Sequence, residues 1–183
     1  MRFPPRLTTA RTLLRAWQPD DVPALKAALD RNKEHLQPWI PWATGEDTPL
    51  ETVTARVKAF VDDFAADRNW IYGIFSPDGS SILGGTGLHD RIGPGGLEVG
   101  YWIDRGHINR GLGGEVAGAL TDLAFGDPAV ERVEMHIDAR NLASARIPAR
   151  LGFELAELRQ KPERPGSEVE VTMMIWRQGR GRR

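Results

Sequence analysis

The sequence predicts a single α+β domain. Its 183 residues, 40% of them hydrophobic, suffice for one sizeable core and are too few for two. Three apolar runs in the middle of the chain are separated by Pro-Asp-Gly and Gly-Pro-Gly-Gly turns, which is typical of an antiparallel meander. Amphipathic helical segments precede and follow these runs. We therefore expect a mixed, mostly antiparallel central sheet of about seven strands flanked by about four helices.

The N-terminal third predicts one strand and two helices. Residues 13–17 form a short strand, and Asp20 then caps a helix that runs through Leu29. Two prolines within residues 36–43 forbid regular structure and predict an ordered aromatic loop. The sequence Thr48-Pro49-Leu50-Glu51 reads as a capping box with proline at the first helical position. The helix that follows has one apolar face, made by Val53, Val57, Phe60, Val61 and Phe64.

The remaining elements follow in order. Strands are expected at 70–75, 82–88 and 97–103, and a helix at 112–125 ends before Asp127-Pro128. A strand at 133–137 and a helix at 141–151, closed by Gly152, come next. The chain finishes with strands at 153–159 and 169–176, and the run 177–183, which holds four arginines among glycines, is expected to be a disordered tail.

Composition excludes several classes of protein. A formal charge of −1 provides no global field for nucleic acid or an anionic membrane, so neither is expected as a partner. The absence of cysteine rules out disulfides, thiolate metal sites and a cysteine acyl-enzyme, and the four histidines are too scattered to suggest a metal site. Neither a signal-peptide core nor a membrane-spanning apolar stretch is present, so we expect a cytoplasmic protein.

The most informative stretch leads from the strand at 97–103 through a glycine-rich loop into the helix at 112–125. Glycines let consecutive backbone N–H groups approach an oxyanion, and the positive end of the helix adds to the attraction. The alternative is that the glycines only make a tight turn. The chain has no Walker A Gly-Lys pair, and Val116 stands where a dinucleotide motif would need its third glycine. Nucleoside triphosphates and dinucleotides are therefore disfavoured.

Three ordered motifs resemble the GNAT acetyltransferases, and within them the RimJ/RimL type. Residues 108–113 are similar to the family's CoA loop Q/R-x-x-G-x-G/A, with Gly111 and Gly113 matching and Ile108 departing from the expected Gln or Arg. Residues 97–102 are similar to its E-x-G-Y-W strand. Asn141-x-x-Ser144, with residues 151–153 after it, is similar to its second CoA motif. The resemblance implies a GNAT fold with acetyl-CoA as cosubstrate and no metal.

The resemblance also implies roles for individual residues. Glu98 is the candidate general base: strand alternation directs it away from the apolar face, beside Gly100, although a solvent-facing carboxylate would do the same. The family often places a proton-donating tyrosine where this chain has Pro148. Ser144 therefore becomes the candidate acid, with a plain helix polar residue as the alternative.

The predicted contacts of acetyl-CoA are mostly backbone groups. The strand edge at residues 101–103 is expected to pair with the pantetheine arm, and Asn141 to reach CoA as well as cap its helix. The full predicted set is Tyr101, Trp102, Ile103, Ile108, Asn109, Arg110, Gly111, Leu112, Gly113, Gly114, Asn141 and Ser144. Trp39, Trp42 and Trp70 are the candidate acceptor contacts, and core or lid packing is the alternative for each.

The expected function is transfer of an acetyl group from acetyl-CoA to a primary amine by direct attack, with a protein or peptide N-terminus as the acceptor. A small amine such as an antibiotic, polyamine or amino acid is one alternative. Others are a non-catalytic acyl-CoA-binding module and a structural protein. Whether the chain forms a homodimer is left open.

Overall fold

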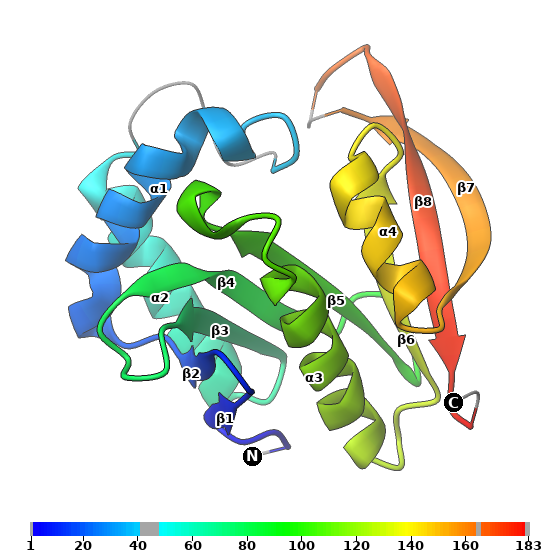
Figure 1. Ribbon diagram of the computed structural model, residues 1–183, viewed down its shortest axis with the longest axis horizontal. Helices are drawn as coiled ribbons and strands as arrows, with labels where there is room; N and C mark the ends of the chain where they lie inside the picture. The colour runs from blue at the N-terminus through cyan, green and yellow to red at the C-terminus, as the bar shows by residue number, and fades with distance from the viewer. Residues whose placement is uncertain (1, 41–47, 164–165, 182–183) are drawn as a thin grey trace.

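The computed structural model describes residues 2–40, 48–163 and 166–181 and contains one eight-stranded sheet. The strands lie in the order β1-β2-β3-β4-β5-β6-β8-β7 (Figure 1). Their bounds are β1 Arg6–Thr8, β2 Leu13–Ala16, β3 Asn69–Phe75, β4 Ile82–His89, β5 Gly96–Ile103, β6 Arg132–Asp138, β7 Glu154–Pro162 and β8 Glu170–Gly179. In these ranges no helix has the length and apolar character that a bilayer crossing requires.

The pairing of β5 with β6 divides the sheet. It is parallel, whereas the other strand pairs are antiparallel, and it runs only from Gly96↔Arg132 to Glu98↔Glu134. On its other side, β5 pairs with β4 as far as Ile103. Within the described residues, the edge of β5 that faces β6 therefore has no strand partner after Glu98.

Two pairs of helices cover the two faces of the sheet. Helices α1 (Val22–Leu36) and α2 (Leu50–Ala65) contribute to an apolar cluster with one face of β2, β3 and β4. Helix α3 (Leu112–Gly126) packs on the opposite face, next to α4 (Leu142–Arg150) (Figure 1). The cluster under α3 continues into β6, so the core on that side spans the divided sheet.

The N-terminal predictions need correction in detail. The eighth strand, β1, is short and carries no apolar alternation that would have revealed it. Helix α1 begins after a 3-10 turn, with Asp21 rather than Asp20 at its N-cap, and continues to Leu36. Pro49 takes the N-cap position of α2 without a side-chain cap, so the predicted capping box does not form. Residues 41–43 of the predicted aromatic loop lie outside the described residues.

The start of the arginine-rich C-terminal run is ordered, which differs from the predicted tail. Arg177 lies within β8 and donates a 2.8 Å hydrogen bond to Glu134. Arg180 donates to the backbone carbonyls of Val130 and Glu131. These partners on β6 and the turn before it hold the run in place. Residues 182 and 183 lie outside the description.

A buried carboxylate fixes the end of β5 to helix α1. Asp104, 5% exposed, accepts hydrogen bonds from Arg31, Asn32 and the Gly106 backbone. Burial by itself would raise the pKa of Asp104, but these donors outweigh it and lower the pKa to about 2. The network orients the chain just before the glycine-rich loop.

Candidate functional site

A cavity of about 1230 Å³ passes through the gap between β5 and β6. Its lining includes Val99 and Tyr101, which face α3, and Glu98 and Trp102, which face the other side of the sheet. Side chains of β6 line it in the same alternating way. The cavity can therefore be reached from both faces, which is the geometry that two substrates approaching from opposite sides require.

Glu98 lies at the point where β5 and β6 separate. It is 6% exposed, and Arg91 binds it twice, through Nη2 at 2.5 Å and Nε at 2.8 Å. Burial works to raise the pKa of Glu98, but the hydrogen bonds and the charge of Arg91 outweigh it and bring the pKa below its ordinary value. Glu98 is therefore an anion at neutral pH. The prediction that it points away from the apolar face is confirmed.

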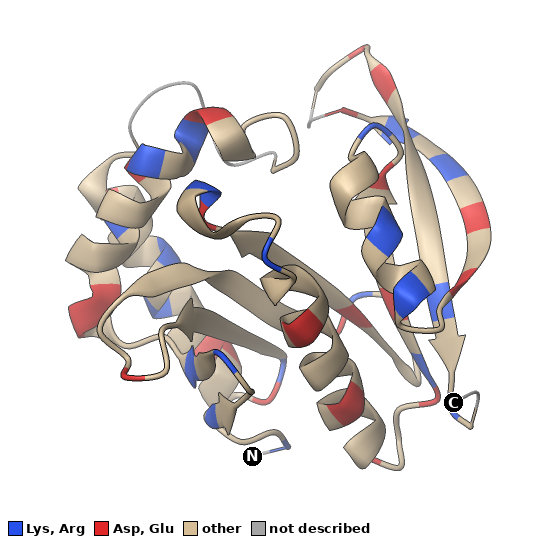
Figure 2. Cartoon of the chain, viewed as in Figure 1, with Lys and Arg blue, Asp and Glu red and all other residues tan. Residues whose placement is uncertain are grey.

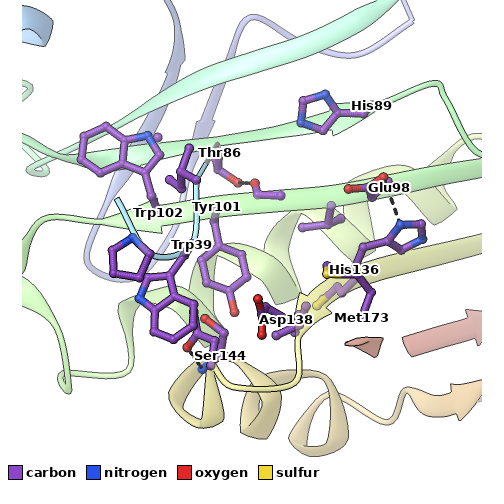
Figure 3. A pocket seen from close by; sticks show the side chains of 18 of the residues that line it. Trp39, Thr86, His89, Glu98, Tyr101, Trp102, His136, Asp138, Ser144 and Met173 are labelled. Atoms are coloured by element: carbon purple, nitrogen blue, oxygen red, sulfur yellow. Dashed lines mark hydrogen bonds and ion pairs between the residues drawn. The ribbon is translucent and has the colours of Figure 1, made fainter. Parts of the chain in front are cut away.

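His136 of β6 joins two buried carboxylates. Its Nε2 lies 2.8 Å from Glu134 Oε2, and its Nδ1 lies 3.6 Å from Glu98 Oε2 (Figure 3). Glu134 in turn accepts from Arg177. Sequence reasoning missed His136, because a lone histidine on a strand carries no signal until β6 is placed beside β5.

A second histidine lies across the β4–β5 pair. His89 is the register partner of Glu98 and lines the same cavity. Burial first, and then the charge of Arg91, lower the pKa of His89 to about 4, against the opposing effect of Glu98. It is therefore uncharged at neutral pH and a weak base. Gly100 leaves the space beside His89 open, because it has no side chain. A Cβ at this position would stand 3.4 Å from His89 Nε2.

The other end of the cavity presents two hydroxyl groups. Asn141 caps α4 by accepting from the Ser144 backbone N–H at 3.1 Å, which places Ser144 in the first turn. The Tyr101 ring points toward Ser144 (Figure 3). The Tyr101 hydroxyl is buried and has no hydrogen bond of normal geometry to any described residue. Burial raises the pKa of Tyr101, and the nearby Ser144 hydroxyl partly offsets this rise. Tyr101 was predicted as a backbone contact only.

Pro148 lies inside α4 as expected, so the Ser144 carbonyl has no N–H four residues later to accept from.

The glycine-rich loop before α3 has the backbone that an anion site needs. Asn109 and Gly111 have positive φ angles of 59° and 78°, and Gly111 is the N-cap of α3. A Cβ on Gly113 would meet Ile147 and Tyr101 at 3.1 and 3.2 Å, whereas a Cβ on Gly114 would meet nothing within 4 Å. The first turn of α3 is thus packed on one side and open on the other, which fits a pyrophosphate group.

The other predicted contacts in this region differ in their exposure and in the groups they present. Leu112, the first residue of α3, is 6% exposed, so only its backbone can serve a ligand. Ile108 is 39% exposed and offers no charge. The Arg110 carbonyl accepts from Arg11, which ties the loop to the β1–β2 turn. Trp102 and Ile103 lie on the strand edge that β6 leaves unpaired.

The three tryptophans predicted as acceptor contacts have different positions. Trp39 follows α1 and lines the cavity. Trp70 is fully buried and packs edge-on against Phe3, so it is a core residue and the prediction for it is wrong. Trp42 lies outside the described residues. Trp102, predicted only as a backbone contact, and Trp17 add two further indoles to the cavity wall.

Comparison with known proteins gives a consistent result. Residues 11–154 match the family model of the acetyltransferase (GNAT) domain. The chain is 27% identical over 115 residues to the probable N-acetyltransferase YjcK of Bacillus subtilis (strain 168), covering 61% of this chain. It spans 63% of the length of that relative.

Solved structures resemble the whole chain. RimL, a ribosomal L7/L12 alpha-N-protein acetyltransferase in complex with CoA, superposes with a TM-score of 0.81 at 22% identity, covering 94% of this chain and 96% of that one. The ribosomal-protein-S5-alanine acetyltransferase of Vibrio fischeri has a TM-score of 0.81 at 17% identity, with coverages of 96% and 97%. The microcin C7 self-immunity acetyltransferase MccE, in complex with acetyl-CoA and AMP, has a TM-score of 0.83 at 16% identity and 93% coverage of both chains. At these identities the likeness concerns the fold.

Proposed function

The chain belongs to the GNAT acetyltransferase family, and we propose that it moves the acetyl group of acetyl-CoA to the α-amine of a protein or peptide N-terminus. The observation that carries this proposal is the cavity through the sheet. The start of α3 packs against Tyr101 on the wall at one end of the cavity, and Glu98 with His136 lies toward the other end. RimL and the Vibrio fischeri relative, named for acting on ribosomal proteins, lend support to the choice of acceptor.

The reaction is a direct transfer. The amine nitrogen attacks the thioester carbonyl carbon, a C–N bond forms, the C–S bond breaks, and CoA leaves as a thiolate that takes up a proton. Glu98 receives the proton that the nitrogen loses, directly or through water, and the chain of His136 and Glu134 orients it. The Ser144 hydroxyl, with Tyr101 beside it, donates a hydrogen bond to the departing sulfur, which takes its proton from water while Glu98 returns one proton to the solvent.

The weak basicity of Glu98 favours an α-amine over an alkylamine. At pH 7 about one α-amine in ten is already neutral, whereas only about one lysine-type amine in 2,500 is. A carboxylate of lowered pKa cannot readily deprotonate the second kind before attack. It can accept the proton after the C–N bond begins to form, because the attacking nitrogen then becomes strongly acidic.

The loop at residues 108–114 is the proposed pyrophosphate site. Backbone N–H groups at the start of α3 would bind the phosphate oxygens, with the helix dipole adding to the attraction. Arg110 would supply the charge that Ile108 lacks. The unpaired edge of β5 at residues 101–103 would bind the pantetheine amides as an added strand.

The experiment is to incubate the protein with acetyl-CoA and a panel of N-terminal peptides, free amino acids and polyamines, following thiol release and product mass. Acetylation at peptide α-amines is the expected result, with Glu98→Gln as the matched variant that keeps the size of the side chain. Acetylation of small amines alone would overturn the choice of acceptor. Acetyl-CoA binding without turnover of any amine would overturn catalysis.

A further inference from the structure

A second cavity of about 490 Å³ adjoins the first and is unusually rich in charge. Seven of its eight lining residues are charged or titratable: Arg91, Glu98, Arg132, Glu134, His136, Arg159 and Arg177, with Ile92 the eighth. Glu98, His136 and Arg159 also line the main cavity. A molecule whose amine reaches Glu98 therefore has this second cavity beside its next few atoms.

The charges in this cavity do not cancel. Four arginines come from four separate segments: the β4–β5 loop, β6, β7 and β8. Against them stand the carboxylates of Glu98 and Glu134 and that of Glu157, which pairs with Arg159 at the rim, so the formal sum of +4 and −3 is +1 with His136 neutral. Across the molecule, by contrast, basic and acidic positions are interspersed along the elements (Figure 2). The excess is therefore a local feature.

The cations lie outermost. The side chains of Arg91, Arg159 and Arg177 are 59%, 54% and 46% exposed, whereas those of Glu98 and Glu134 are 8% and 6% exposed. Both carboxylates lie beneath this layer and accept hydrogen bonds from two of its members, Arg91 and Arg177. A ligand that enters the cavity thus meets guanidinium groups first.

These guanidinium groups have hydrogen-bonding capacity beyond their present bonds. A guanidinium carries five N–H donors. Arg91 binds Glu98 through Nε and Nη2, Arg177 binds Glu134 through the same two atoms, and Arg159 uses its own pair on Glu157. Among the described residues, no bond occupies their Nη1 groups. These groups can therefore donate to a carboxylate, the planar anion that arginine binds most specifically.

We propose that this cavity is an anion subsite of the acceptor, so that the enzyme selects N-termini with an aspartate or glutamate directly after the residue that is acetylated. The inference rests on the proposed function and narrows its substrate class. The acceptor's α-amine lies at Glu98, and the side chain of its second residue extends into the arginine-lined cavity. An acidic side chain there gains charge-assisted hydrogen bonds, whereas a basic one is repelled.

The test compares peptides that differ only at the second residue, glutamate, glutamine or lysine, with free aspartate as a small acidic amine. We expect kcat/KM for the glutamate peptide to exceed that for the glutamine peptide by about tenfold or more, and the lysine peptide to be poorest. The preference should shrink as salt is raised, because these exposed charges are screened. Acetylation of free aspartate in preference to every peptide would overturn the inference.

Arg159→Gln is the matched variant, since Arg159 lies on the exposed edge strand β7 and, among the described residues, its side chain hydrogen-bonds only Glu157, two residues away. It should lower kcat/KM for the glutamate peptide more than for the glutamine peptide, and Arg159→Lys should restore part of the difference. Arg68→Gln, at an exposed arginine paired with Asp63, is the control that should leave the preference intact.

Equal kcat/KM for the glutamate and glutamine peptides in the native protein would overturn this inference while leaving N-terminal acetylation standing. A preference that does not respond to salt would also count against it. If no peptide were acetylated, the proposed function itself would fail.

Discussion

Replacing Gly114 by alanine separates ligand binding from folding at the proposed pyrophosphate site. Gly114 is the third residue of α3, and an added Cβ would have no protein atom within 4 Å. Alanine is better than glycine inside a helix by about 0.5–1 kcal/mol. The free energy of unfolding of the ligand-free protein should therefore rise by about that amount, which is about 1–4 °C in Tm for a chain of this size.

The same methyl group should weaken acetyl-CoA binding. It would occupy the open side of the first turn, where the N–H groups of α3 have no helical partners and a phosphate would approach closely. Loss of one charge-assisted hydrogen bond costs about 1.5–3 kcal/mol. That corresponds to an increase in Kd of about tenfold to a hundredfold.

The assay pairs thermal unfolding without ligand with calorimetric titration of acetyl-CoA. Gly126→Ala is the control, because Gly126 ends the same helix and also has no atom within 4 Å of an added Cβ. It should leave Kd unchanged. An unchanged Kd for Gly114→Ala, with the expected rise in Tm, would refute the assignment of the phosphates to this end of α3.

Three further predictions follow from the same geometry. Glu98→Gln should lower kcat by about a hundredfold or more without changing acetyl-CoA affinity. Because the pKa of Glu98 is lowered, the rate of the native protein should follow the deprotonation of the acceptor's α-amine up to about pH 8. A separate step in the pH–rate profile between pH 4 and 6 would contradict this. Ser144→Ala and Tyr101→Phe should each lower kcat more for acetyl-CoA than for an activated thioester with a good leaving group, and an equal loss on both would remove the hydrogen-bond-donor role. Asp104→Asn should lower the free energy of unfolding by about 2 kcal/mol near neutral pH. The native pKa of Asp104, about 2, lies below the ordinary 3.8, so this stabilisation is present above about pH 4 and is lost as the pH falls through about 2. Urea titrations that show a pH-independent difference between the native protein and the variant would contradict this.

The sequence allowed most of the fold and the backbone part of the site to be predicted, because both depend on local patterns. Alternation along β5 placed Glu98 on the correct face, and the loop up to Gly114 followed from glycine spacing. The partners of Glu98 could not be predicted in this way. Arg91 belongs to a turn, and His136 reaches Glu98 only because β6 pairs with β5 across about forty residues of chain.

The same limit explains two other differences. Tyr101 was predicted only as a backbone contact on β5, yet its ring points toward Ser144 of α4. Trp70 and Trp39 look alike in sequence, since each is a tryptophan followed by an isoleucine. Packing against Phe3 buries the first, and the end of α1 places the second at the cavity. Such distinctions depend on tertiary contacts and not on local pattern.

The short β5–β6 pairing has a consequence for motion. Only three register pairs join the halves of the sheet directly, while the apolar cluster under α3 is continuous across them. On the other face, Val171, Met173 and Ile175 form a cluster separate from the one under α1 and α2. The two halves of the sheet are thus joined continuously by the core on the α3 face, whereas the core on the opposite face is interrupted. Amide hydrogens of β6 and β8 should exchange faster in the free protein than those of β3 and β4, and a bound strand-like ligand should bring the two rates together.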